Sequence, residues 1–294
     1  MNEILDKLII RILFTFFICS ALFVYKYAHA IFYPSRKKQI LKKIYPSENY
    51  VDTLHIFARI IGIAIIFSTL EFNEYQGLFK STLDFFILGT MGMGLYLGSL
   101  YITESIILYN FDYVDECLKK KNAAYGIVSF ANAIALSLII QTLFDESEHS
   151  LVILFILWLF ALVLYGFSTK LYKYVSSLPF NSLMIQKNLG MSISYAGFLL
   201  GTSIVLISAF NHEHHEITSY CLQVVLKAIL AALVFPIFRM GLITIFRIQE
   251  LKSDTEEPAH LGLGVYEGAI FVTCGLLTSI IIGQIHFGTI YPFF

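Results

Sequence analysis

The sequence has few charged residues and no arrangement of cysteines that suggests a cross-linked or zinc-binding domain. Asp, Glu, Lys and Arg make up 14% of its 294 residues, against about 25% in typical soluble domains. This scarcity argues against an ordinary soluble fold. The four cysteines are far apart along the chain, so neither a disulfide framework nor a zinc site is indicated; they are Cys19, Cys117, Cys221 and Cys274.

Long apolar runs are abundant instead, since hydrophobic residues make up 57% of the chain. A helix needs about 20 mainly apolar residues to cross the hydrocarbon core, and lipid admits only helices or closed barrels. No strand-type alternation competes with the helical interpretation. We predict an all-α polytopic membrane protein with eight transmembrane helices, over residues 8–32, 53–70, 83–109, 123–144, 150–174, 188–210, 217–246 and 260–286. The first run contains Arg11 and Lys26 and lacks a small-residue cleavage site, so it is not a cleavable signal peptide.

Basic residues occur in alternate loops, which predicts the orientation in the membrane. The loops after the first, third, fifth and seventh runs are basic, whereas the loops EFNEYQGLFK, DESEH and NHEHHE contain one lysine, Lys80. We expect the basic loops in the cytoplasm and both termini outside a bacterial cytoplasmic (inner) membrane. The net charge of −1 carries no information about nucleic acid, because charge is sorted by membrane side. No nucleic-acid partner is expected. The segment RKKQILKKIY is either a short amphipathic helix on anionic lipid or a solvated basic loop; its basic residues are Arg36, Lys37, Lys38, Lys42 and Lys43.

Small residues recur in the even-numbered runs. We number positions in these runs from four anchors, Asn49, Asn122, Asn188 and His260. The small residues are Thr53, Gly126, Ser192 and Gly264 at position 4; Ala58, Ala131, Gly197 and Ala269 at position 9; Gly62, Ala135, Gly201 and Thr273 at position 13; and Ala64, Ser137, Ser203 and Gly275 at position 15. Helices in lipid associate where small residues allow close approach. Positions 9 and 13 lie nearly opposite positions 4 and 15, so each even helix should pack on two sides.

The pattern predicts four helix-hairpin repeats in parallel orientation, related by an axis along the membrane normal. It divides the chain into two four-helix units, residues 1–144 and 145–294. An oligomer is compatible with this arrangement.

A polar layer is predicted between the two small-residue faces, at positions 7, 10 and 14. Either its residues bond to one another and hold the helices together, or they line a permeation path. Glu267 lies too deep to reach water easily, so we expect it to be protonated, paired or hydrated by an internal cavity. Arg59 is the first candidate partner and Arg239 the second, while Glu104 competes for either arginine. The candidate residues of the layer are Arg59, Asn132, Tyr195, Glu267, Glu104 and Arg239.

The stretch KKKNAAYGIVSFANAIALS, residues 119–137, resembles the YjfL-like family of bacterial inner-membrane proteins, the domain of unknown function numbered 350. The family motif is an asparagine followed by small residues that open a helix. Matching residues are Asn122, Ala123, Ala124 and Gly126 in this stretch, Asn188, Gly190, Gly197 and Gly201 in the third repeat, and Gly264 and Gly268 in the fourth, where His260 replaces the asparagine. Typical members look like one four-helix unit, so this chain resembles two units in tandem.

The resemblance implies little chemistry, because the family has no agreed activity. It implies an envelope-stress context and a cytoplasmic membrane-remodelling protein as a partner. From the sequence we favour an ion or small-solute pathway along the polar layer. The alternative is a membrane-stress scaffold or sensor that recruits cytoplasmic partners through its basic loops. An intramembrane enzyme is disfavoured because no catalytic constellation is visible, and no cofactor is expected.

Three other features have local interpretations. The loop NHEHHE offers His212, His214 and His215, but a hydrated turn is favoured over a metal or proton sensor, and no metal site is predicted. Lys227, early in the seventh run, is expected to snorkel outward. The pair Gly94 and Gly98 in the third run is interpreted as a packing signal.

Overall fold

The computed structural model describes residues 2–32, 46–70, 77–147, 150–176, 178–212, 216–247, 260–285 and 287. Its regular elements are α1 (Asn2–Phe32), α2 (Tyr50–Phe67), α3 (Leu78–Ile107), the π-helical turn η3 (Val114–Lys119), α4 (Ala123–Glu146), α5 (Leu151–Lys170), α6 (Tyr172–Val175), α7 (Phe180–Ile185), α8 (Leu189–Phe210), α9 (Ile217–Phe246) and α10 (Leu261–Gln284). Within these residues, eight helices are long and apolar enough to cross a membrane. The predicted all-α, eight-helix membrane class is confirmed. The basic residues at 36–43 lie outside the described residues.

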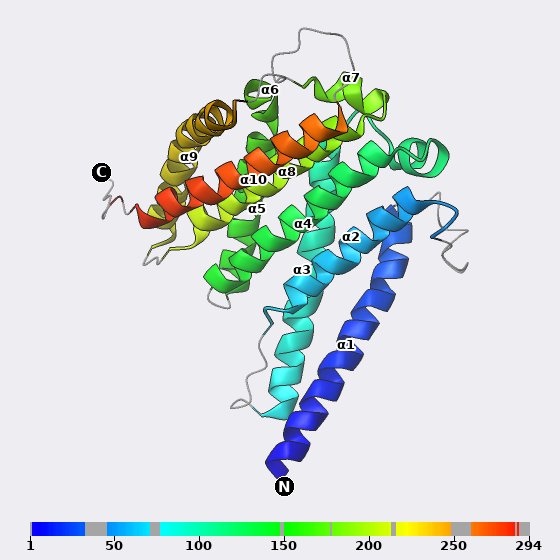
Figure 1. Ribbon diagram of the computed structural model, residues 1–294. Helices are drawn as coiled ribbons and strands as arrows, with labels where there is room; N and C mark the ends of the chain where they lie inside the picture. The colour runs from blue at the N-terminus through cyan, green and yellow to red at the C-terminus, as the bar shows by residue number, and fades with distance from the viewer. Residues whose placement is uncertain are drawn as a thin grey trace.

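The helices form two layers (Figure 1). Helices α2, α4, α8 and α10 lie side by side in one row, in that order. Helices α1, α3, α5 and α9 pack against this row, with α3 and α5 crossing behind its middle and α9 lying on α8 and α10. The row is continuous between the two halves of the chain, because α4 packs directly on α8. The core therefore lies between the layers, where large side chains such as Tyr96, Tyr165 and Phe271 are fully buried.

Glycine brings α8 and α10 together at backbone distance. A Cβ atom added at Gly197 would collide with the backbone of Gly268, and one added at Gly264 would collide with the backbone of Gly190. Such contacts are possible only where neither helix carries a side chain, which is how helices associate in lipid. Gly94 differs, since a Cβ atom there would meet nothing within 4 Å. The predicted packing role of Gly94 is therefore wrong.

The anchor asparagines begin the inner helices as N-caps. The side-chain oxygen of Asn122 accepts a hydrogen bond from the amide of Ala124 at 3.1 Å, and Asn49 and Asn188 cap α2 and α8 in the same way. An N-cap side chain satisfies a backbone amide that has no partner within the helix. His260 stands at the N-cap of α10 without a side-chain cap bond. The sequence motif thus marks where each inner helix starts.

The same asparagines connect successive repeats. The Asn49 amide nitrogen donates to the carbonyl of Cys117, 2.9 Å away, in the turn before α4. The Asn122 amide nitrogen donates to the carbonyl of Met184, 3.1 Å away, in the turn before α8. Helices α2 and α4 are therefore each fastened at their start to the segment that leads into the next inner helix.

Lysines strengthen these connections at the same end of the bundle. Lys121 Nζ donates to the carbonyl of Glu48, and Lys187 Nζ donates to the carbonyl of Lys120, each at 2.7 Å. Both lysines have left-handed backbones, with φ of 48° and 56°. Lys120 Nζ lies 2.6 Å from the buried carboxylate of Glu116, and this hydrogen bond raises the pKa of Lys120.

Candidate functional site

The first buried ion pair joins α2 to α3. Arg59 Nη2 lies 2.6 Å from Glu104 Oε1, and their side chains are 3% and 10% exposed. Position 10 of α2 points Arg59 toward the second layer, where Glu104 occupies the last turn of α3. Charges this deep in a membrane bundle are costly unless paired. Pairing therefore offsets the cost of burying both charges, and it requires two helices, because Arg59 lies on α2 and Glu104 on α3.

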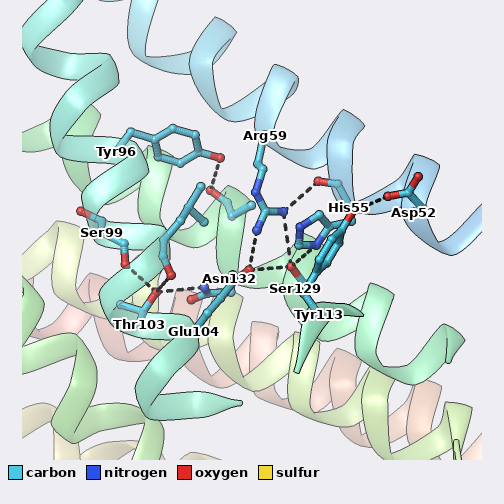
Figure 2. Close-up of polar contacts among 12 residues, drawn as sticks. Asp52, His55, Arg59, Tyr96, Ser99, Thr103, Glu104, Tyr113, Ser129 and Asn132 are labelled. Atoms are coloured by element: carbon cyan, nitrogen blue, oxygen red, sulfur yellow. Dashed lines mark hydrogen bonds and ion pairs between the residues drawn. The ribbon is translucent and has the colours of Figure 1, made fainter. Parts of the chain in front are cut away.

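A chain of hydrogen bonds runs from this pair to a histidine (Figure 2). Ser129 Oγ of α4 donates to Glu104 Oε1 at 2.9 Å, and His55 Nδ1 lies 3.0 Å from Ser129 Oγ. Arg59 Nη1 also donates to the His55 carbonyl at 2.9 Å. Because the single hydroxyl proton of Ser129 goes to Glu104, His55 Nδ1 is the donor to Ser129 in this arrangement. The cluster therefore couples a titratable imidazole to a carboxylate through one hydroxyl.

Asp52 and Tyr113 extend this cluster at the start of α2. The His55 ring lies 4.6 Å from the Tyr113 ring, measured between centroids. The Tyr113 hydroxyl donates to Asp52 Oδ1 at 2.6 Å. Asp52, His55 and Arg59 lie along one face of α2, at spacings of three and four residues. This shared face follows from the sequence, although only Arg59 is among the residues predicted from it.

Asn132 lies beside this cluster and joins three helices. Its amide nitrogen donates to Thr103 Oγ1 on α3 at 3.0 Å, and its amide oxygen accepts from the Tyr165 hydroxyl on α5 at 3.2 Å. Both oxygens and the amide are buried. A buried amide inside a membrane helix needs such partners, and Asn132 finds them in the second layer.

The second buried ion pair joins α9 to α10. Arg239 Nη2 lies 3.0 Å from Glu267 Oε1, with side chains 15% and 0% exposed. Ser194 Oγ of α8 donates to Glu267 Oε2 at 2.5 Å, and Ser176 Oγ donates to Oε1 at 3.0 Å. The Tyr172 hydroxyl is 2.9 Å from Ser194 Oγ. Glu267 is therefore held by a guanidinium and two hydroxyls.

The two pairs form separate clusters, which corrects the sequence interpretation. Arg59 pairs with Glu104, so the first expectation, a pair between Arg59 and Glu267, is wrong, and the second candidate, Arg239, is the partner of Glu267. Tyr195 joins neither pair; its ring packs on Tyr172 at 4.7 Å, measured between centroids.

Both clusters lie nearer the N-terminal ends of the inner helices. Arg59 is nine residues beyond the start of α2 and Glu267 six beyond the start of α10, or about 14 and 9 Å along their helices at 1.5 Å per residue. In a core about 30 Å thick, this places both in the half nearest the N-terminal caps of the inner helices. The charged residues assigned to the polar layer therefore form two separate centres in the same half of the bundle.

The remaining candidates do not add to these centres. His212 is buried, and its ring stacks on Tyr220 at 4.5 Å between centroids, while His214 and His215 lie outside the described residues. In the part of the chain that the structure describes, no three His, Cys, Asp or Glu side chains are grouped as metal ligands. Lys227 is 0% exposed, so the expected outward snorkelling is wrong.

A cavity of about 350 Å³ lies between α5, α8 and α9. Its walls are mostly apolar, with Phe198, Phe235 and Pro236 among them, and Lys170 is the one charged residue among its lining side chains. Neither ion pair borders it. The cavity and the polar centres are therefore separate features.

Sequence comparison agrees with the tandem architecture. The family described as Domain of Unknown Function (DUF350) matches residues 3–144 and, a second time, residues 147–282. The chain belongs to the DUF350 family. The resemblance to two DUF350 units in tandem is thereby confirmed, and each unit contributes one buried ion pair, Arg59–Glu104 or Arg239–Glu267. No curated protein and no solved structure matches the chain.

Several residues of the two centres were not predicted from the sequence. His55 and Asp52 could have been found from their spacing to Arg59 on α2. Ser176 could not, because it follows the short helix α6 and approaches Glu267 across 91 residues of sequence. Only the packing of the connection between α5 and α8 brings it there.

Proposed function

We propose that this integral membrane protein is an ion pathway, that the ion is the proton, and that Glu104 and Glu267 carry it. The observation that supports this proposal is the hydrogen-bonded series His55, Ser129, Glu104, which runs from the inner row to α3. Chains of histidine and carboxylate groups at membrane depth are typical of proton relays.

The geometry favours protons over larger ions. Glu267 is fully enclosed and Glu104 is 10% exposed, so neither carboxylate faces a water-filled pore wide enough for a hydrated ion. A proton needs only a series of donors and acceptors. Each carboxylate already has hydroxyl donors within 3.0 Å, from Ser129 to Glu104 and from Ser176 and Ser194 to Glu267. Protonation of either carboxylate would weaken its ion pair, which gives each centre two states.

The proposal can be tested with proteoliposomes that contain a pH-sensitive dye and are driven by a potassium diffusion potential. Ser129→Ala interrupts the series by removing one hydroxyl. The matched control is Ser137→Ala on the same helix, because Ser137 is also 0% exposed but its hydroxyl bonds only the carbonyl of Ile134 in its own helix.

We expect Ser129→Ala to reduce proton flux at least tenfold and Ser137→Ala to leave it within twofold of the wild type. Both variants should elute as folded protein, since a membrane hydrogen bond contributes only about 0.6 kcal/mol on average. Wild-type flux no greater than that of empty liposomes would refute the proposal. So would equal flux in the two serine variants.

A second candidate is a scaffold that recruits a cytoplasmic membrane-remodelling protein. It is favoured by exposed lysines beside η3, where the side chains of Lys119 and Lys120 are 70% and 56% exposed. However, Lys119 is already paired with Asp115 at 2.7 Å and Lys120 with Glu116. Absence of proton flux together with copurification of a soluble partner, lost on Lys119→Glu, would favour the scaffold.

A further inference from the structure

The inner row repeats one interface. We define the leading face of an inner helix as positions 2, 9 and 13 after its anchor, and the trailing face as positions 4, 8 and 15. Gly264, at position 4 of α10, lies against Gly190, at position 2 of α8. Gly126, at position 4 of α4, likewise lies against Val51, at position 2 of α2. Leading face meets trailing face in both cases, at the same positions.

The α8–α10 interface shows the same order along its length. Gly197, at position 9 of α8, faces Gly268, at position 8 of α10. Farther along, Gly201 at position 13 faces Gly275 at position 15. The direction of the row is therefore fixed, with each helix presenting its leading face to the next.

Among the described residues, the row has two ends that no further helix covers. The residues at positions 9 and 13 are buried in α2, α4 and α8, but Ala269 and Thr273 at these positions of α10 are exposed. Gly262, at position 2 of α10, has open space where a Cβ atom would stand. At the other end, position 15 is buried in α4, α8 and α10, but Ala64 of α2 is exposed.

In the part of the chain that the structure describes, the second layer leaves both ends of the row open. Helix α9 contacts α10 through the pair Arg239–Glu267 and through the stacked rings of Phe235 and Phe271, which lie away from Ala269. Helix α1 packs mainly on α3 and reaches α2 through Phe67, near the far end of that helix.

We infer that a second copy of this chain extends the row, with the leading face of α10 in one molecule packed on the trailing face of α2 in the next. The occupant is a second copy because the trailing face that fits α10 is the one its own α2 displays, and the α2–α4 and α8–α10 contacts already use these positions. Both faces carry small residues, Gly262, Ala269 and Thr273 on α10 and Thr53 and Ala64 on α2, which permit the close approach on which helix association in lipid depends. Position 8 of α2 is Phe57, as position 8 of α4, which already packs on α2, is Phe130. The two faces differ, so the contact is heterologous and closes into a ring or continues as a filament.

The internal interfaces predict which residues meet. Position 13 faces position 15, so Thr273 of one molecule should lie beside Ala64 of the next. Thr53, at position 4 of α2, is eleven residues from Ala64, or about 16 Å along the helix. Thr53 should therefore lie beyond the reach of a cysteine at position 273.

Cysteine cross-linking of the full chain in native membranes tests this arrangement. The variant Thr273→Cys with Ala64→Cys should form a ladder of covalent dimers and larger species. The control, Thr273→Cys with Thr53→Cys, should yield at least fivefold less. Both variants carry Cys19→Ser, because Cys19 is exposed, and they share the other native cysteines.

A bulky residue provides a second measurement on folded protein. Ala269→Phe should reduce the Thr273–Ala64 cross-link at least fivefold, whereas Val163→Phe, at an exposed position of α5, should leave it unchanged. Equal cross-linking by both cysteine pairs, or none by either, would overturn the inference. Efficient cross-linking by Thr273→Cys alone would also overturn it, because that result means a symmetric α10–α10 contact.

Discussion

Replacing Glu267 by glutamine removes one charge from the most enclosed ion pair. Glu267 is 0% exposed and Arg239 15% exposed, so glutamine leaves a guanidinium largely buried without its counter-charge. Breaking a buried pair in this way costs about 3–5 kcal/mol. Because Arg239 retains some exposure, we expect the lower end, about 3 kcal/mol.

The hydroxyl donors contribute much less. Interhelical hydrogen bonds in membrane proteins average about 0.6 kcal/mol, so Ser194→Ala should cost about 1 kcal/mol or less although its bond to Glu267 is 2.5 Å long. The ion pair, rather than the serines, should therefore dominate the stability of this centre. Replacing Arg239 by glutamine together with Glu267→Gln should cost less than the sum of the single changes.

Reversible unfolding in mixed micelles, followed by circular dichroism, measures these free energies. An added Glu104→Gln supplies the control, because Glu104 belongs to the other ion pair, with Arg59. Its effect should add to that of Glu267→Gln within about 0.5 kcal/mol. A cost below about 1 kcal/mol for Glu267→Gln, or strong coupling between Glu267 and Glu104, would refute the assignment of two separate buried pairs.

Three further predictions concern packing, capping and orientation. Gly264→Ala should destabilise the protein by about 1–3 kcal/mol, because the added Cβ atom would overlap the backbone of α8. Gly94→Ala should stabilise the protein by up to about 1 kcal/mol in the same unfolding assay, because a Cβ atom at position 94 would meet nothing within 4 Å. Asn122→Ala should cost more than the roughly 1 kcal/mol of a lost N-cap, because the buried amide also bonds Met184 and Glu116; a thermal shift no larger than that of an exposed alanine substitution would contradict this. If both termini lie outside, an impermeant thiol reagent applied from outside should label Glu216→Cys and spare Lys119→Cys, and the opposite pattern would reverse the orientation.

The sequence by itself determined the class of the protein and the positions of its spans. Apolar run length is a local property, because each transmembrane helix satisfies its own backbone bonds in lipid. The asparagine anchors could also be identified from the sequence, because an N-cap side chain accepts a hydrogen bond from an amide only two or three residues further along the chain. The family resemblance and its tandem form rested on the same short motifs.

Only the tertiary structure decided which charged side chains pair and which helix faces are covered by a neighbouring helix. Helical spacing places Arg59 and Glu267 on equivalent faces, but a face does not specify the helix that covers it. Helix α3 brings Glu104 to Arg59, and α9 brings Arg239 to Glu267. Gly94 and Lys227 show the same limit, because identical residue types lie against lipid or inside the bundle according to the neighbours they meet. Those neighbours are set by packing between segments far apart in sequence, which a period of 3.6 residues does not encode.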